Sequence, residues 1–285
     1  MNRIRVVADS ACDLPDELVA ELGITLVPLH IRFGDEELVD RAELSTKEFW
    51  ARTASADQLP ETAAPSPGAF REAFEAAQAA GAEGAVCIDL SSKLSATIQA
   101  ARQAARDLEG TFPVRVVDSL TVTMGLGLVV LAAAEAAAGG AGLDEVVAVA
   151  ERAAGAVKVY GAIDTLDNLK RGGRIGGASA LVGSLLAIKP VIEVRDGVVE
   201  QESRQRTRVK SLRYLADKVK AAGQPVARLA AVGADARDFD EFLGMLADVR
   251  SEHPLLVGDI GPVIGTHAGP GAVGVAWLPA TPSGV

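Results

Sequence analysis

Apolar positions in the first half of the chain form short runs that alternate with segments in which apolar residues recur with a helical period. This alternation is typical of a layered α/β domain with a mostly parallel sheet. The pattern predicts strands over residues 4–10, 24–33, 84–90 and 114–119, and helices over 13–23, 66–81, 95–110 and 123–139. The last of these helices is apolar on nearly every side, so we expect it in the interior of the domain.

The second half of the chain follows a different pattern. An Asp196-Gly197 pair separates two strand-like runs, which indicates a hairpin. Further elements are a strand over 227–234, helices over 211–223 and 238–250, and strand-like runs over 255–261, 262–269 and 271–279. We therefore predict two domains: an N-terminal α/β domain, residues 1–155, and a C-terminal α+β domain, residues 156–285, with a mixed or antiparallel sheet.

Composition narrows the function classes. The 285 residues are 49% apolar and 23% charged, as in a globular protein, and the net charge of −10 and 4% aromatic content disfavour nucleic-acid binding. The longest apolar run, 126–138, contains Glu135 and is shorter than the ~20 residues that span a bilayer, so we expect no stable membrane insertion. No secretory signal precedes the first strand, and Cys12 and Cys87 lie in different elements, which favours the cytoplasm over a disulfide-bonded secreted protein.

Polar pairs follow three predicted strands of the first half. They are Asp9-Ser10, Ser91-Ser92 and Asp118-Ser119. In an open α/β sheet the carboxyl ends of the strands line the ligand crevice, next to helix N-termini that favour an anion. Ser92 is expected one or two residues before a helix start, where it either binds a ligand or only caps the helix.

Two further residues are candidate donors. Thr62 lies in a loop between structure breakers and either faces a ligand or is an ordinary loop residue. His267 lies in an irregular segment rich in glycine and proline, in which a histidine is either a donor or structural. His30 and His253 look structural or exposed, and three scattered histidines with two cysteines do not make a zinc site, so we expect no metal.

Sequence signals for nucleotide binding are weak. Residues 269–274 match GxGxxG, but only 11 residues follow, too few for the helix and second strand of a dinucleotide site. No GxxxxGK[ST] phosphate loop occurs.

Two basic clusters interrupt this acidic chain and either are solvated or face an anionic group or an acidic partner. They are Lys170, Arg171 and Arg174, and then Arg204, Arg206, Arg208, Lys210 and Arg213.

Taken in order, these motifs resemble the DegV family over nearly the whole chain. The matching segments are VVADSACDLP, PETAAPSPGAF, SSKLSATIQAA, VVDSLTVTMGLG, LDNLKRGGRIG, IKPVIEVRDG, RTRVKSL and IGTHAGPGAVGVAW. The resemblance implies a two-domain DegV-like α/β fold that holds one long-chain fatty acid, of the palmitate, stearate or oleate class, at the domain interface.

The resemblance also implies which residues bind the ligand. The family's carboxylate contacts correspond to Thr62, Ser92 and His267, and its arginine near the ligand entrance corresponds to Arg206. Ser91, Ser119 and Gly125 lie in matching motifs and are assigned to the ligand site with them. The chain departs from the family pattern at three positions near the head group, which are Ala63, Ala64 and Ala96.

The expected function is that of a lipid-binding carrier in phospholipid metabolism, not an enzyme, with no cofactor. It would bury the acyl tail, hold the carboxylate with uncharged donors, and present it to a separate ATP-dependent fatty acid kinase that the Lys170–Arg174 segment and Arg206 face. One alternative is an acyl-ester hydrolase with Ser92 as nucleophile and His267 as base, although no GxSxG elbow occurs. Another is a carrier of a different amphiphile, such as a sterol, isoprenoid or acyl phosphate.

Overall fold

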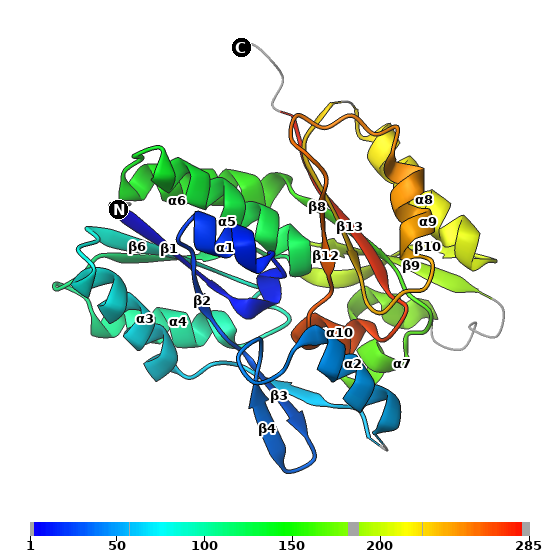
Figure 1. Cartoon of the computed structure of the whole chain (residues 1–285), viewed down its shortest axis with the longest axis horizontal. Coiled ribbons are helices and arrows are strands. Elements are labelled where there is room, and N and C mark those ends of the chain that lie inside the picture. The colour runs from blue at the N-terminus through cyan, green and yellow to red at the C-terminus, as the bar shows by residue number, and fades with distance from the viewer. Residues whose placement is uncertain (1–2, 57, 182–187, 224, 281–285) are drawn as a thin grey trace.

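A four-stranded parallel sheet forms the core of the first half of the protein. The computed structural model describes residues 3–56, 58–181, 188–223 and 225–280. The strand order is β2-β1-β6-β7, and all pairs are parallel (Figure 1). The strands are β1 (Ile4–Asp9), β2 (Thr25–Val27), β6 (Gly84–Asp89) and β7 (Val114–Asp118). Every residue of β6 is buried, as expected for a central strand covered by helices on both faces.

A six-stranded mixed sheet forms the second half, in the order β10-β9-β8-β13-β11-β12. Its strands are β8 (Lys158–Ala162), β9 (Lys189–Arg195), β10 (Val198–Gln205), β11 (Val226–Gly233), β12 (Leu256–Asp259) and β13 (Val273–Pro279). Only the β11–β12 pair is parallel among these described strands. The hairpin prediction is confirmed, because β9 and β10 pair across Asp196 and Gly197, which both have positive φ.

A small antiparallel sheet, β4-β3-β5, lies beside the parallel sheet (Figure 1). Its strands are β3 (His30–Phe33), β4 (Glu36–Val39) and β5 (Glu61–Ala63). The prediction of one strand over 24–33 is therefore wrong, since β2 and β3 belong to different sheets. Pro28 has no N–H to continue a ladder, and the chain leaves the parallel sheet there.

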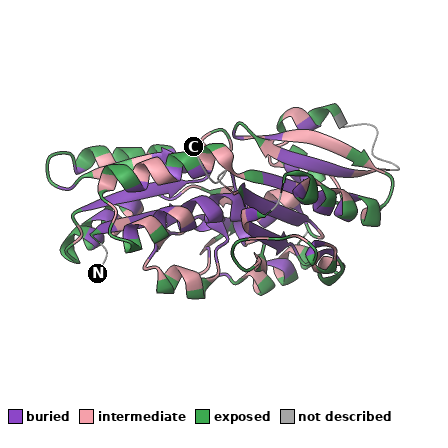
Figure 2. Ribbon diagram, turned by 90° about the horizontal axis from the view of Figure 1, so that it is seen from above, coloured by how far each residue is buried: buried purple, intermediate pink, exposed green. Residues whose placement is uncertain are grey.

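Helices cover the outer faces of the sheets, and buried strands run through the middle of the molecule (Figure 2). The described helices are α1 (Asp16–Glu21), α2 (Thr46–Ser55), α3 (Pro67–Ala79), α4 (Thr97–Asp107), α5 (Thr123–Ala138), α6 (Leu143–Ala156), α7 (Asp167–Arg171), α8 (Arg208–Ala221), α9 (Phe239–Leu246) and α10 (Pro262–Ala268), with 3-10 turns η1 (Ser10–Cys12) and η2 (Gly176–Leu181). Ser66 caps α3, with Pro67 at its first position, because its hydroxyl accepts a hydrogen bond from the Ala69 amide.

The segment 262–269, predicted as a strand, forms helix α10 instead. Pro262 occupies the first helical position, and the Thr266 hydroxyl donates back to the Pro262 carbonyl at 2.9 Å. Gly269, with φ of 80°, ends the helix. A run of only seven residues is too short for its apolar positions to distinguish the two periodicities.

Helix α5 is the interior helix that the sequence predicts. Twelve of its sixteen residues are buried, and it contacts β1 and β6 on one side and β8, β11 and β13 on the other. Because one continuous apolar cluster includes residues from both sheets, the two halves share a core. The first sheet ends at Asp118 and the second begins at Lys158, and the predicted domain boundary after residue 155 stays a prediction.

Gly125 is needed where α5 crosses the second sheet. A Cβ there would lie 2.2 Å from Val159 Cγ2 and 2.5 Å from Thr121 Oγ1, whereas a Cβ at Gly155 on α6 would meet nothing within 4 Å. We expect Gly125→Ala to lower the free energy of unfolding by about 1–3 kcal/mol through overpacking. The control Gly155→Ala should raise it by up to ~1 kcal/mol. Urea denaturation measures both, and a Gly125→Ala protein as stable as the parent contradicts this packing.

Candidate ligand-binding site

A cavity of about 190 Å³ lies between the loop after β6, the β9–β10 hairpin and α10. One water molecule needs roughly 10–15 Å³ by this measure, so the cavity admits a much larger ligand. Fourteen of its eighteen lining residues are apolar, contributed by segments far apart in sequence. Leu29 and Leu90 line it from the first half, and Ile192, Val199 and Ile264 from the second.

Four polar side chains line this cavity among the described residues: Thr62, Ser95, Arg174 and His267. Thr62, in β5, and His267, in the last turn of α10, are joined by a hydrogen bond of 3.1 Å between Oγ1 and Nε2. The fold thus brings together two predicted site residues that are 205 positions apart. This pair forms one polar point in a mostly apolar wall, which also contains Ser95 and Arg174.

His267 is held neutral at pH 7. Burial, followed by the positive charge of Arg174, lowers the pKa of His267 to about 4. Its Nδ1 has no hydrogen-bond partner among the described residues, and a Cβ at Gly172 would lie 2.3 Å from that atom. Gly172 is therefore the residue that lets the segment after α7 close over the imidazole ring.

Arg174 corrects the expectation of an entirely uncharged cavity mouth. Its guanidinium lines the cavity, and it donates hydrogen bonds from Nε to the Leu94 carbonyl at 3.0 Å and from Nη1 to the Gly172 carbonyl at 2.6 Å. These bonds connect the segment after α7 to the loop after β6. Lys170 and Arg171 of the same cluster are exposed, so only Arg174 turns inward.

Ser92 does not lie where the sequence predicts. The lining residues include Ser95 but not Ser92, and α4 begins at Thr97, five residues after Ser92. The Ser92 amide donates to Asp118 Oδ1 at 3.1 Å. Ser95 is the hydroxyl at the helix start, because its Oγ accepts from the Thr97 amide at 3.3 Å.

The three polar strand ends do meet at one edge, since β1, β6 and β7 are neighbours. Their hydrogen bonds, however, are made within the protein. Ser91 Oγ donates to the Gly197 carbonyl at 2.7 Å, and Ser119 Oγ bonds the backbone of Thr121. Asp9 accepts from the amides of Ala11 and Leu90, and burial raises its pKa to about 7. Three predicted ligand-binding residues do not line the described cavity: Ser91, Ser119 and Gly125.

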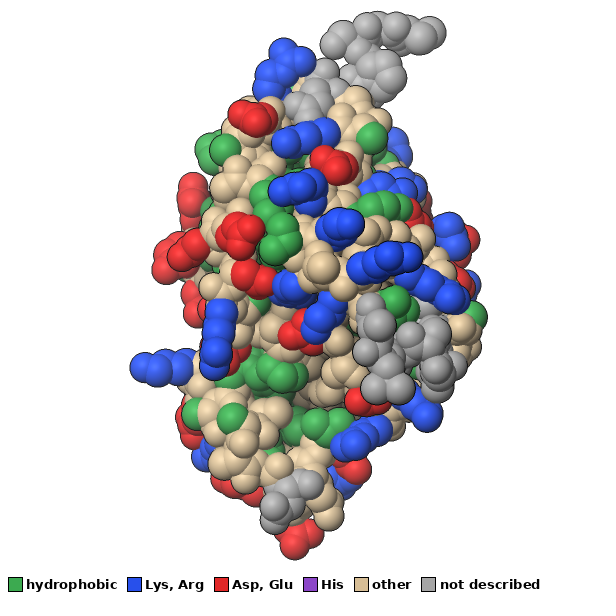
Figure 3. Space-filling view, turned by 90° about the vertical axis from the view of Figure 1, so that its right-hand side faces the viewer, with side chains coloured by type: hydrophobic (Ala, Val, Ile, Leu, Met, Phe, Trp, Pro, Cys, Tyr) green, Lys and Arg blue, Asp and Glu red, His purple; other side chains and the backbone are tan. Residues whose placement is uncertain are grey.

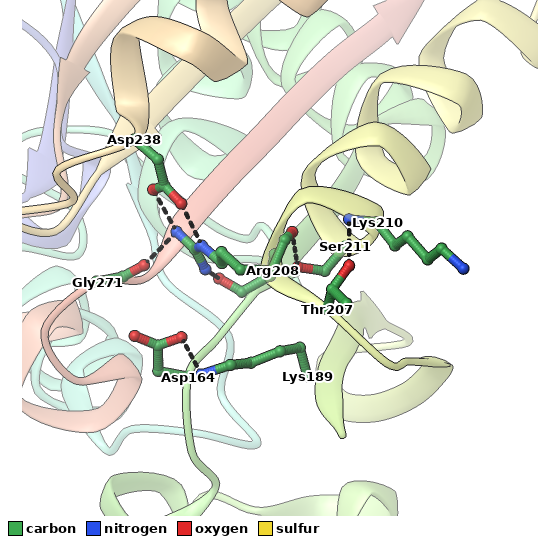
Figure 4. A network of polar contacts seen from close by, with 9 residues as sticks. Asp164, Lys189, Thr207, Arg208, Lys210, Ser211, Asp238 and Gly271 are labelled. Atoms are coloured by element: carbon green, nitrogen blue, oxygen red, sulfur yellow. Dashed lines mark hydrogen bonds and ion pairs between the residues drawn. The ribbon is translucent and has the colours of Figure 1, made fainter. Parts of the chain in front are cut away.

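The second basic cluster divides into exposed and internal residues. Arg208 is internal: its Nε and Nη2 donate to Asp238 at 2.8 and 2.9 Å, and Nη2 also donates to the Gly271 carbonyl (Figure 4). The other members, Arg204, Arg206, Lys210 and Arg213, are exposed. Figure 3 shows Lys and Arg side chains gathered on the side of the molecule where α8 and β10 lie, with acidic side chains between them. Arg206 is not among the cavity-lining residues.

Two polar lining residues, Ser95 and Arg174, were not assigned to the ligand from the sequence. A signal for Ser95 was its place at the start of the helix predicted over 95–110, since hydroxyl side chains at a helix start face free amides. Arg174 follows a Gly-Gly pair, which allows a sharp turn after α7: Gly173 has φ of 70°. That turn brings the arginine back toward the cavity and away from the exposed face of its cluster.

The protein has an α/β fold in which a parallel sheet and a mixed sheet both pack against one interior helix. Residues of both halves line an apolar cavity that contains a few polar groups. The chain belongs to the DegV family: residues 3–280 match the family described as "Uncharacterised protein, DegV family". A DegV domain-containing protein of Deinococcus radiodurans is 40% identical, over 97% of this chain and 98% of the relative. One of Streptomyces coelicolor is 38% identical, over 96% and 98%.

Solved structures agree with this assignment. A DegV family protein from Thermus thermophilus, described as fatty acid binding, superposes with a TM-score of 0.90 at 33% identity, covering 98% of this chain and all of its own. DegV of Bacillus subtilis, described as a fatty acid binding protein, has a TM-score of 0.84 at 28% identity, with the same coverage. The DegV-like α/β fold expected from the sequence, with one parallel and one mixed sheet, is thereby confirmed.

The described part of the chain holds no helix that combines the length and apolar character required to cross a bilayer.

The lowered pKa of His267 predicts its titration. Between pH 4 and 6.5 the unfolded state binds the proton more strongly, so the stability due to neutral His267 is complete above pH 6.5 and is lost toward pH 4. An NMR titration of its Hε1 resonance, assigned with His267→Gln, should have a midpoint of about 4. Arg174→Gln should raise the midpoint without reaching 6.5, because burial is the larger cause, and exposed Arg171→Gln should leave it unchanged. A parent midpoint near 6.5 contradicts the burial of the ring.

Proposed function

We propose that the cavity binds one long-chain fatty acid, with its carboxylate at Thr62, His267 and Arg174 and its tail along the apolar lining. The main observation behind this proposal is the composition of the cavity wall, in which fourteen described residues are apolar and a few are hydrogen-bond donors. An amphiphile with one small anionic group and a long hydrocarbon chain matches that wall. The relatives from Thermus thermophilus and Bacillus subtilis, described as fatty acid binding, support the same ligand class.

The donors suit a carboxylate, which only accepts hydrogen bonds. A neutral His267 can donate from Nε2–H to Thr62 Oγ1, and the Thr62 hydroxyl then has its own proton to donate to the ligand. The positive charge of Arg174 compensates the charge of the carboxylate in this partly buried place. Neutral donors orient the head group, and one cation stabilises its ionised form.

The acyl tail supplies most of the affinity, because burying each CH₂ contributes about 0.8 kcal/mol. The tail would run between the hairpin residues Ile192 and Val199 and the helix residues Val263 and Ile264. The small side chains Ala63, Ala64 and Ala96, where the family pattern has larger polar residues or glycine, line the same cavity. They make the head-group region more apolar, so fewer contacts hold the carboxylate.

The protein acts in this proposal as a non-enzymatic carrier that presents the carboxylate to a separate kinase. The exposed basic residues Lys170, Arg171 and Arg206 provide a positive surface for an acidic partner. The hydrolase alternative lacks support, because the imidazole bonds Thr62, and no hydrogen bond links Ser92 to His267 in the described chain. A nucleophile and its base must lie within hydrogen-bond reach.

Lipid extraction and mass spectrometry of the purified protein should detect a bound long-chain fatty acid, and delipidated protein should bind oleate. Thr62→Val removes a hydrogen bond to a charged group, worth ~1.5–3 kcal/mol, so the Kd for oleate should rise about tenfold or more. Thr53→Val is the matched control, because the Thr53 hydroxyl is buried, has no hydrogen-bond partner among the described residues, and lies outside the cavity lining. Its Kd should not change.

Absence of any fatty acid from the purified protein, together with no binding of added palmitate or oleate, would sink the proposal. Equal effects of the two threonine variants would remove Thr62 from the head-group site.

Ser95 and Ser92 provide a second matched pair. Because Ser95 lines the cavity and Ser92 does not, Ser95→Ala should weaken oleate binding severalfold and Ser92→Ala should leave it unchanged. Isothermal titration measures the affinity, and thermal unfolding of both variants controls for the loss of the Ser95–Thr97 contact. The reverse order of effects would restore Ser92 as the carboxylate contact and show that the loop after β6 rearranges on binding.

A further inference from the structure

Helix α10 carries four residues that line the cavity: Val263, Ile264, His267 and Ala268. It has seven residues, and a helix of this length is not stable in water without tertiary contacts. Its N-cap residue, Gly261, has no side chain with which to cap it. Near its end α10 is held by the Asn168 amide, which donates to the Thr266 carbonyl at 3.0 Å. Its first turn needs a contact from another segment.

Asp13, in the loop after η1, makes that contact. This buried carboxylate accepts a hydrogen bond through Oδ1 from the Gly261 amide, at 3.1 Å, and one through Oδ2 from Thr123 Oγ1, at 2.6 Å. The contact is close: a Cβ at Gly261 would lie 2.6 Å from Asp13 Oδ1. Asp13 and Thr123 both have positive φ, at 52° and 48°, a conformation that costs free energy for residues other than glycine.

We propose that Asp13 is a positioning residue: by fixing the first turn of α10 at Gly261, it sets the placement of His267 against Thr62. His267 lies six positions after Gly261, about 9 Å along a helix. Over that length a single helix moves as a rigid body, so a shift at its start displaces the imidazole by a similar amount. The proposal concerns the ring itself, and only its consequence for affinity rests on the proposed fatty-acid binding.

The hydrogen bond between Thr123 and Asp13 makes it possible to distinguish a positioning role of Asp13 from a general effect on stability. Thr123 is the first residue of α5, so its bond anchors α5 and does not touch α10. Thr123→Ala removes that bond and leaves the Gly261 contact. Asp13→Asn keeps both bonds, since its Oδ1 still accepts from Gly261 and the Thr123 hydroxyl can turn to accept from its amide. Burial raises the pKa of Asp13 to about 7, so the site already accommodates an uncharged carboxyl group at neutral pH.

The test measures the titration midpoint of His267 by NMR in the ligand-free protein. Among the described residues, Arg174 is the charged group that lowers the pKa of His267, and Thr62 and Gly172 contact the ring from other elements. Asp13→Ala should release the first turn of α10, shift the ring so that water reaches it, and raise the midpoint from about 4 toward 6.5. Asp13→Asn and Thr123→Ala should keep it near 4.

A second variant approaches the contact from α10 itself. Gly261→Ala places a methyl group against Asp13 Oδ1 and leaves the carboxylate in place, so it should shift the His267 midpoint as Asp13→Ala does, even where Asp13→Ala does not fold. The φ of −66° at Gly261 suits alanine, so no backbone strain confuses this result.

Oleate affinity is measured on the same proteins. Asp13→Ala and Gly261→Ala should raise the Kd about tenfold, and Asp13→Asn and Thr123→Ala should stay within about threefold of the parent. A midpoint that stays near 4 in both Asp13→Ala and Gly261→Ala overturns the positioning role, as does a Thr123→Ala shift equal to theirs. If the midpoints move as expected but the parent binds no oleate, the positioning role stands and the proposed function fails.

Discussion

Helix α5 is apolar around most of its axis, and twelve of its sixteen residues are buried, so most of its surface must be covered by the rest of the protein. Strands of both sheets pack against it, and segments from both halves line one cavity. Val122, directly before this helix, lines the cavity, and Thr123, its first residue, bonds Asp13. Because α5 is covered by both halves together, the cavity forms where the two halves meet beside the start of this helix.

The chemistry of the cavity depends on how its few polar groups are distributed. At the strand ends, the side chains of Asp9, Ser91, Asp118 and Ser119 form hydrogen bonds with the backbone. The polar side chains that line the apolar cavity are instead Thr62, Ser95, His267 and Arg174. Burial and the nearby guanidinium keep His267 uncharged, so Arg174 brings the positive charge and the others act as neutral donors. This combination favours a single ionised carboxylate over a sterol or an isoprenoid hydrocarbon, which carries no charge to match Arg174.

Much of the fold could be predicted from the sequence, because strands such as β6 and helices such as α3 have clear periodicity and caps. Thr62 and His267 were likewise identified as site candidates, and the fold joins them. Periodicity failed at β2–β3 and at α10, where short segments are fixed by tertiary partners. Ser92 and Arg174 were misplaced for a related reason: the direction of a loop side chain depends on contacts such as Arg174 with Leu94, made across 80 positions of sequence.

The position of the fatty acid can be observed in a crystal structure of the protein with bound oleate. We expect a carboxylate oxygen within ~2.7–3.2 Å of Thr62 Oγ1 or the Arg174 guanidinium, with the hydrocarbon chain between the β9–β10 hairpin and α10. A ligand with its carboxylate at the strand-end serines, or with its tail outside this cavity, would contradict it.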